Sequence, residues 1–280
     1  MNRDRGPVSF PLHVEATGRG PPLVLLHGFG AHSYTWRHWT PELARHHRVL
    51  EVDLKGFGSA PKPRDDAYGP LDHARLVLRL FRDRELEGAT LVGHSFGGTV
   101  SLLLTLLLLE GEPERLDRLV LVAAGAYPQT LPRYMRLARI PFLGRLMLRL
   151  IPSRTLARAA LRSTYRHPDR VTDSQVEAYA QGLRSRGGRH AVVSTARQVL
   201  TVDPGAWTSR YPEIGIPTLL LWGDRDPIVP VETGRRLERD LPDARLVLVE
   251  ECGHVPQEEK PRASLEPVLA FLRESSGAAP

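Results

Sequence analysis

The sequence is short of cysteine, and that scarcity excludes several kinds of fold and site. Cys252 is the sole cysteine among 280 residues. A single thiol cannot close an internal disulfide or build a cysteine-rich metal site, so the fold has to rest on its hydrophobic core. Reducing conditions suit such a chain, and we expect a cytoplasmic location.

Long apolar runs are also missing. The longest lies near residues 100–109 and is interrupted by Ser101 and Thr105, whereas a membrane-spanning helix needs about 20 apolar residues. We interpret this run as a buried helix. The charged start of the chain leads into no apolar signal-peptide core, so secretion is not expected.

Signatures of nucleic-acid binding do not accompany the basic charge of the chain. Lys and Arg number 38 against 32 Asp and Glu, which gives a formal net charge of +6. Without a helix-turn-helix, zinc-finger or RNA-binding motif we expect no nucleic-acid partner, a role that would predict salt-dependent retention on DNA. We interpret the charge as a solvated, arginine-rich surface, with weak contact to an anionic membrane as the alternative.

What the sequence does contain is the pattern of an α/β protein. Residues 8–15 alternate apolar and polar side chains and precede a turn at 17–21, which predicts an antiparallel strand and an opening hairpin. Short valine- and leucine-rich segments predict further strands at 23–26, 49–54, 90–92, 119–122, 218–222 and 246–249. Helices are expected at 36–46, 72–84, 96–110 and 232–241. This alternation predicts a mostly parallel central sheet flanked by helices.

The alternation fails over residues 128–212, where prolines and helix-forming stretches occur without a convincing strand. Such a length is too great for a bare loop. We therefore predict a core made of residues 1–127 and 213–280, with a helical cap at 128–212 inserted over the edge of the sheet.

The strongest chemical signal is Gly93-His94-Ser95-Phe96-Gly97, which joins an expected strand to an apolar helix. A serine exposed at such a sharp turn needs small neighbours, and the glycines provide the space. Its position at a helix N-terminus also favours developing negative charge. Ser95 is the candidate nucleophile.

A serine hydroxyl needs a base, and the base needs an acidic partner. His254 is the best placed of 11 histidines, because it follows the expected strand 246–249 in a loop at a carboxyl edge. Asp224 and Asp226 both follow the strand 218–222. We favour Asp226 as the acid, because it lies farther into the loop, while Asp224 could brace the turn.

Backbone N–H groups are expected to stabilise the oxyanion without rearrangement. Leu26-His27-Gly28-Phe29-Gly30 ends a strand and has the glycines that such a loop requires. The amides of Phe29 and Phe96 are the candidate donors.

Together these residues resemble the α/β-hydrolase superfamily, with nucleophile, acid and histidine in the expected order. The loops Val52-Asp53-Leu54-Lys55-Gly56-Phe57-Gly58-Ser59 and Gly253-His254-Val255-Pro256-Gln257-Glu258-Glu259-Lys260-Pro261 also look like loops of that family. The resemblance implies a helical cap that shapes substrate choice and a serine hydrolase acting on carboxylic esters or related acyl compounds. It implies no metal and no organic cofactor.

Relatives in that superfamily differ in nucleophile. Haloalkane dehalogenases and epoxide hydrolases place an aspartate where this chain has Ser95, so their reactions are disfavoured. Carbon–carbon bond hydrolases of ring-cleavage diketones keep a serine but commonly have a tryptophan where this chain has Val255. Perhydrolases share the triad, and slow-turnover ligand receptors use the same fold.

The predicted partner is a small acyl substrate. Candidate pocket residues come from the strand ends, the histidine loop and the basic, amphipathic part of the cap, whose apolar side could line an acyl pocket: His27, Gly28, His94, Met135, Phe142 and Val255. Of these, His27 and His94 are expected to shape the site by packing or hydrogen bonding. The arginines of this stretch could instead snorkel into water from a helical pair packed on the core.

Overall fold

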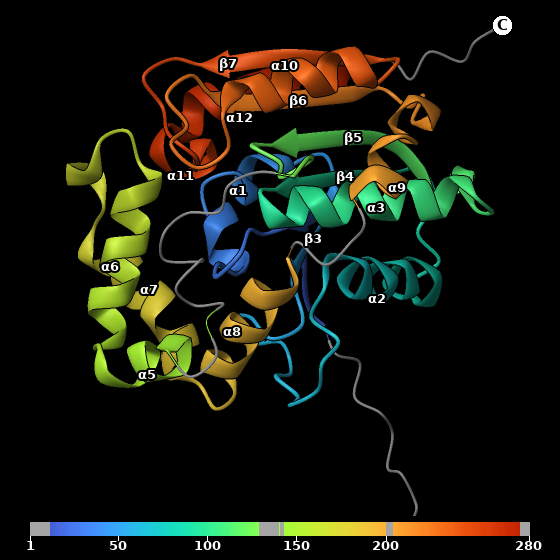
Figure 1. Cartoon of the computed structure of the whole chain (residues 1–280). Coiled ribbons are helices and arrows are strands. Elements are labelled where there is room, and N and C mark those ends of the chain that lie inside the picture. Colours follow the sequence, from blue (N-terminus) through green and yellow to red (C-terminus); the bar gives the residue numbers. More distant parts are fainter. Residues whose placement is uncertain (1–11, 129–139, 141–142, 200–203, 275–280) are drawn as a thin grey trace, which may run out of the picture.

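The computed structural model describes residues 12–128, 140, 143–199 and 204–274. In this part of the chain a seven-stranded sheet forms the centre of the protein, in the order β1-β3-β2-β4-β5-β6-β7 (Figure 1). The strands are β1 (His13–Thr17), β2 (Pro22–Leu26), β3 (Arg48–Asp53), β4 (Ala89–His94), β5 (Leu116–Val122), β6 (Thr218–Gly223) and β7 (Ala244–Val249). β1 pairs antiparallel with β3, and the other neighbouring strands are parallel. The predicted α/β fold with a mostly parallel sheet is confirmed.

The expected opening hairpin is wrong. β1 pairs with β3, with Val14 opposite Val52, while β2 lies between β3 and β4. Residues 23–26 of β2 are buried, whereas residues 15–17 of β1 are exposed. A strand that is apolar on both faces is best covered inside the sheet, and a half-exposed strand belongs at its edge.

Successive residues of the central strands serve two separate hydrophobic clusters, because side chains alternate between the faces of a sheet. Val24 and Leu26 belong to one cluster, together with residues of α2 (Pro70–Asp83), α3 (Phe96–Leu109) and α10 (Val231–Asp240). Leu23 and Leu25 belong to the other cluster, together with residues of α1 (Thr40–Leu43) and α12 (Pro261–Arg273). The sheet is therefore covered on both sides.

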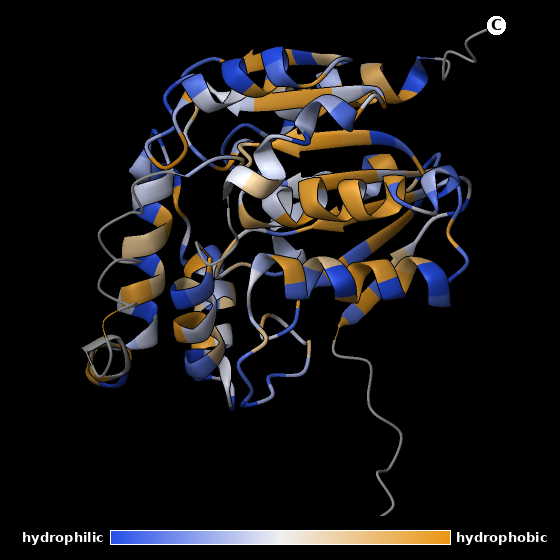
Figure 2. Cartoon of the chain, turned by 45° about the vertical axis from the view of Figure 1, so that its right-hand side comes forward, coloured by the Kyte–Doolittle hydropathy of each residue, from blue (hydrophilic) through white to orange (hydrophobic). Residues whose placement is uncertain are grey.

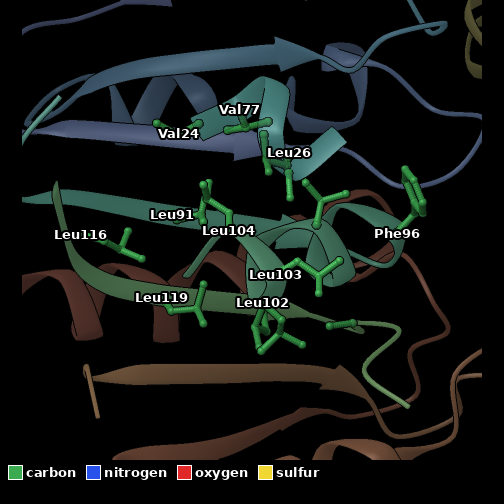
Figure 3. Packing of buried hydrophobic residues seen from close by; sticks show 14 of the residues in the cluster. Val24, Leu26, Val77, Leu91, Phe96, Leu102, Leu103, Leu104, Leu116 and Leu119 are labelled. Carbon is green, nitrogen blue, oxygen red and sulfur yellow. The ribbon is translucent and has the colours of Figure 1, made fainter. Parts of the chain in front are cut away.

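Helix α3 is the most apolar helix-forming stretch of the core, and it is orange along most of its length in Figure 2. Leu102, Leu103 and Leu104 are buried near Leu91 and Leu119 of the sheet (Figure 3). Its hydroxyl groups bond to the preceding turn, Ser101 to the carbonyl of Gly97 and Thr105 to that of Ser101. The apolar run is thus a buried helix. None of the helices in the described part of the chain combines the length and apolarity that a membrane crossing requires.

The expected helix at 36–46 is shorter than predicted. Its place is taken by a 3-10 turn, η1 (Ser33–Trp36), and the single turn of α1. Pro41 lies at the start of α1, and proline is tolerated in a first helical turn but not in a helix interior. The other three expected core helices begin and end within two residues of prediction. The prediction had not placed η2 (Pro113–Arg115), α11 (Pro256–Glu259) or α12.

The regular elements that the structure describes in the insertion between β5 and β6 are all helices. Its elements are α5 (Leu143–Leu150), α6 (Ser153–Thr164), η3 (Pro168–Arg170), α7 (Asp173–Arg184), α8 (Gly188–Gln198), α9 (Pro204–Thr208) and η4 (Tyr211–Glu213). Helices α5, α6 and α7 gather beyond the ends to which the arrows of β5 and β7 point (Figure 1). Tyr127 and Tyr211, near the two ends of the insertion, stack edge to face with ring centroids 5.6 Å apart. The exact division at 127/128 and 212/213 stays a prediction.

Parallel strands bring their carboxyl ends to one edge, where loops from distant parts of the chain can meet. Ser95 follows β4, Asp226 follows β6, and His254 follows β7. The fold thus places three residues that are far apart in sequence at the same edge of the sheet.

Candidate active site

Ser95 occupies a strained turn between the last residue of β4 and the first residue of α3. Its backbone has φ 53° and ψ −113°, a conformation that costs a non-glycine residue about 1–3 kcal/mol. The neighbouring strand end fixes it: the Ser95 amide donates to the carbonyl of Val122 at 2.9 Å, and the amide of Gly125 donates to the Ser95 carbonyl at 3.2 Å.

The glycines on either side of Ser95 allow backbones to approach closely. A Cβ atom on Gly97 would lie 2.3 Å from the carbonyl oxygen of Leu26, and one on Gly93 would lie 2.3 Å from Oγ of Ser101. Any other residue at these positions would push β2 or α3 away from the turn. The spacing of glycines in the sequence therefore has the steric cause that was inferred for it.

The three predicted side chains form one chain of hydrogen bonds. Nε2 of His254 lies 2.9 Å from Oγ of Ser95, and Nδ1 of His254 lies 2.8 Å from Oδ2 of Asp226. Since a carboxylate only accepts, Nδ1 carries the proton and Nε2 is left to accept the serine hydroxyl. The side chains of His254 and Asp226 are 5% and 0% exposed, so water competes little for these bonds.

The structure separates the two candidate acids. Asp226 also accepts the amides of Ile228 and Val229, at 2.7 and 2.9 Å, through Oδ1. Asp224 instead accepts the amide of Cys252 at 3.2 Å. It thus braces the histidine loop, by which we mean residues 250–260 between β7 and α12, with the short helix α11 included. Asp226, which the sequence favoured, is the acid that reaches His254.

The backbone of His254 is held at both ends. Its amide donates to the carbonyl of Thr164, at the end of cap helix α6, at 2.7 Å. Its carbonyl accepts Nε2 of His94 at 2.8 Å. The histidine is therefore fixed between the cap and the turn that holds Ser95.

His27 shapes the site through hydrogen bonds, as the sequence led us to expect, and its place among the pocket residues stays a prediction. This side chain is 0% exposed, Nδ1 donates to the carbonyl of Gly28 at 2.8 Å, and Nε2 accepts the amide of Leu54 at 3.0 Å. With both nitrogens bonded inside the protein, His27 joins the ends of β2 and β3.

The loop after β2 lies against the turn at Ser95. A Cβ atom on Gly28 would lie 3.2 Å from Cβ of Ser95 and 2.8 Å from Nδ1 of His94. This places the residue before Phe29 next to the nucleophile candidate, while Phe96 begins α3 directly after it. The assignment of the Phe29 and Phe96 amides as oxyanion donors stays a prediction.

Buried histidines around the site are kept neutral. Burial lowers the pKa of His94 and of His73 to about 3, and that of His27 to about 4. An uncharged His94, whose ring centroid lies 5.0 Å from that of His254, does not oppose a positive charge on His254. His73 packs edge to face on Phe96, 5.2 Å between centroids.

Asp53 is a site-supporting residue to which the sequence reasoning gave no role. It is 2% exposed and accepts the amides of Ser33 and Ser59, each at 2.7 Å. It thus ties the loop after β2 to the loop after β3, and Gly58 leaves room for its carboxylate, since a Cβ there would lie 2.1 Å from Oδ2. The sequence indicates such a role for Asp53 through its place at a strand end, close before Gly56-Phe57-Gly58.

Two of the remaining pocket candidates, Met135 and Phe142, lie outside the described residues. Val255 is 6% exposed and packs in a cluster with Leu161 and Tyr165 of the cap. Pocket roles for Gly28, His94 and Val255 stay predictions. In the described ranges no group of three or more His, Cys, Asp or Glu residues could hold a metal ion.

Comparison with known proteins identifies the family to which this sequence is similar. The sequence pattern of the alpha/beta hydrolase fold family matches residues 21–261. The pimeloyl-[acyl-carrier protein] methyl ester esterase of Nitrosomonas europaea is 31% identical over 252 residues, which cover 88% of this chain and 93% of the esterase.

Two further matches extend along most of the chain. The 2-hydroxy-6-oxo-6-(2'-aminophenyl)hexa-2,4-dienoic acid hydrolase of Metapseudomonas resinovorans is 28% identical over 271 residues, 93% of this chain and 86% of that hydrolase. The structure of a thermophilic esterase from Thermogutta terrifontis is similar with a TM-score of 0.73 at 25% identity, covering 94% of this chain and 93% of the esterase.

Replacing Asp53 by asparagine tests how the two loops are held. Burial raises the pKa of Asp53, but His27 and the two amides outweigh burial and leave this pKa below its usual value. Because the unfolded chain binds the proton more tightly, the carboxylate stabilises the fold above about pH 4, and this contribution is lost as pH falls through the folded-state pKa. Asp53→Asn should lower the free energy of unfolding by about 1–3 kcal/mol at pH 7.

Urea denaturation between pH 7 and pH 3 measures this effect, with exposed Glu87→Gln as the control. The difference between wild type and Asp53→Asn should shrink as pH falls. A difference that stays constant over this range would show that the charge of Asp53 does not hold the loops.

Proposed function

The chain belongs to the α/β-hydrolase fold family, and we propose that it is a serine hydrolase that cleaves carboxylic esters or related acyl compounds. The observation that carries the proposal is the hydrogen-bonded series Ser95–His254–Asp226 at a strained strand-to-helix turn. Relatives with esterase activity support the reaction class: a pimeloyl-[acyl-carrier protein] methyl ester esterase is 31% identical to this chain.

In the proposed first step, Nε2 of His254 takes the proton of the Ser95 hydroxyl as its oxygen attacks the substrate carbonyl carbon. The resulting imidazolium is stabilised by Asp226, whose position is fixed by the amides of Ile228 and Val229. The tetrahedral oxyanion is held by the amides of Phe29 and Phe96. His254 then returns the proton to the leaving alcohol, and an acyl-Ser95 ester remains.

In the second step, water attacks the acyl-enzyme. His254 takes a proton from this water, the carbonyl carbon becomes tetrahedral again, and collapse releases the carboxylic acid as the proton returns to Oγ of Ser95. Apart from the substrate and water, the proposed reaction needs no chemical group beyond the three side chains and the two backbone amides. The N-terminus of α3, a helix of 14 residues, adds a favourable field for the oxyanion.

Hydrolysis of a carbon–carbon bond in a ring-cleavage product is the second candidate. It is supported by the 28% identity to a hydrolase of 2-hydroxy-6-oxo-6-(2'-aminophenyl)hexa-2,4-dienoic acid. The nucleophile, base and acid are the same in both proposals. Val255, after the histidine, packs on the cap rather than presenting a large ring at this position, and this favours the ester.

The membrane-surface contact inferred from the basic cap stays a proposal. Most of the stretch 133–150 lies outside the described residues or has no described side chain. In the described part of the cap, Arg154, Arg158 and Arg184 pair with Asp173 or Glu177. Exposed pairs of this kind neutralise charge within the cap and are worth little energy, so these three arginines contribute little to an anionic contact.

The two neighbouring aspartates provide a matched test of the acid. Asp226→Asn keeps the size of the side chain but changes the hydrogen bond that orients His254, and kcat should fall by about 10³–10⁴-fold. Asp224→Asn leaves that bond intact and should reduce kcat by less than about tenfold. Steady-state hydrolysis of a short chromogenic ester measures both; equal losses would argue against Asp226 as the partner of the base.

A panel of substrates tests the bond that is cleaved. Acyl esters of increasing chain length, an amide and a vinylogous diketone are compared on wild type and Ser95→Ala. We expect ester turnover with a chain-length optimum and a loss of at least about 10³-fold in Ser95→Ala. Faster turnover of the diketone than of every ester would favour carbon–carbon hydrolysis, and activity retained in Ser95→Ala would exclude both.

A further inference from the structure

Glu258, in α11, is a fully buried carboxylate that follows the candidate base by four residues. Its side chain is 0% exposed. Each carboxylate oxygen accepts two hydrogen bonds. Oε1 accepts the hydroxyl of Thr35, at 2.8 Å, and that of Tyr179. Oε2 accepts the side-chain N–H groups of Arg37, at 2.6 Å, and of Gln175, at 3.1 Å. An isolated carboxylate is costly to bury, and these four hydrogen bonds offset that cost.

These donors come from two parts of the fold that also contact each other directly, since the ring centroids of His32 and Tyr179 lie 5.7 Å apart. Thr35 and Arg37 belong to the core, at η1, while Gln175 and Tyr179 belong to cap helix α7. Glu258 itself lies in the loop that carries His254. One side chain therefore joins core, cap and histidine loop.

The adjacent Glu259 repeats the connection through backbone groups. Its carboxylate accepts the amide of Gly253, directly before His254, at 2.7 Å. It also accepts the amides of Arg166 and His167, at 3.1 and 2.8 Å, in the segment between α6 and η3 of the cap. The start of the histidine loop and the cap are therefore held by the same carboxylate.

His254 itself is bonded to this part of the cap. Its amide donates to the carbonyl of Thr164, and Val255 packs with Leu161 and Val176 of α6 and α7. A displacement of α6 and α7 would break the hydrogen bond between the His254 amide and the Thr164 carbonyl, and it would remove the packing around Val255. The position of the imidazole next to Ser95 thus depends on how the cap is seated.

We propose that Glu258 is a positioning residue that couples the seating of cap helices α6 and α7 to the placement of His254 against Ser95. The reaction that this placement serves is the proposed hydrolysis, and the inference rests on that proposal. The segment α6–α7 then stays docked while the base is active, and its release withdraws the base from the nucleophile.

Buried polar contacts can also serve stability alone. A measurement of stability does not separate this role from positioning, because a well-packed apolar group can replace a buried ion pair without loss of stability. The test therefore includes a change on the cap side of the junction that leaves Glu258 in place. Tyr179→Phe removes one donor from α7 and retains the ring, whereas Gln175 also caps the N-terminus of α7 and is less suitable. Burial and the carboxylate of Glu258 raise the pKa of Tyr179, so its hydroxyl is a permanent donor.

The experiment compares Tyr179→Phe and Glu258→Gln with wild type and with Arg158→Gln. Arg158 pairs with exposed Asp173 and links α6 to α7 without touching Glu258, which makes it the matched control. Two quantities are measured: amide hydrogen exchange of the segment 253–259, and the rate at which a small fluorophosphonate labels Ser95.

We expect both Tyr179→Phe and Glu258→Gln to accelerate exchange at 253–259 and to slow labelling about five- to twentyfold. Kcat for a short ester should fall in parallel while KM changes less than twofold, and Arg158→Gln should resemble wild type. Unchanged exchange at 253–259, unchanged labelling, or a change confined to KM would overturn the positioning role.

The exchange measurement distinguishes this inference from the proposed function. If wild-type Ser95 is not labelled but exchange at 253–259 responds to Tyr179→Phe, the hydrolase proposal fails and the coupling between cap and loop stands. If wild type is labelled and exchange does not respond, the hydrolase proposal stands and the coupling fails.

Discussion

The close approach of three backbones around Ser95 is the constraint on which the rest of the site depends. Gly97 lies so near the end of β2 that a Cβ atom would approach the Leu26 carbonyl to 2.3 Å. This contact keeps Ser95 at positive φ between β4 and α3, a conformation that the residue would not retain by itself. The sheet and α3, both deeply buried, supply the rigidity that offsets the strain.

The second requirement is that the base be held without a competing charge. His254 is fixed through its ring by Asp226, through its carbonyl by His94, and through its amide by Thr164. The buried imidazole of His94 stays neutral, so it can donate a hydrogen bond without repelling an imidazolium beside it. Anchors from the core and the cap therefore meet at one side chain.

Much of this architecture could be predicted from local sequence pattern. The strand ends that carry Ser95, Asp226 and His254 were identifiable because short apolar runs give way to polar loops that contain glycine, and parallel strands end at a common edge. The glycine spacing around Ser95 also has a direct steric meaning.

Features set by tertiary contacts were harder to predict. The pairing of β1 with β3 instead of β2 depends on which strand the core covers, and this does not show in the turn between them. The partners of His27, the carbonyl of Gly28 and the amide of Leu54, could not be predicted from its place at a strand end. Asp53 and Glu258 were visible in recognisable loops, but their partners lie 6 to 223 residues away in sequence.

Covalent labelling tests the central claim most directly. The purified protein is treated with a small fluorophosphonate, digested, and mapped by mass spectrometry. The geometry predicts a single adduct on Ser95, absent in Ser95→Ala and formed far more slowly in His254→Asn. Folded protein in which Ser95 stays unmodified, or in which the adduct lies on another residue, would contradict the assignment of Ser95 as a nucleophile activated by His254.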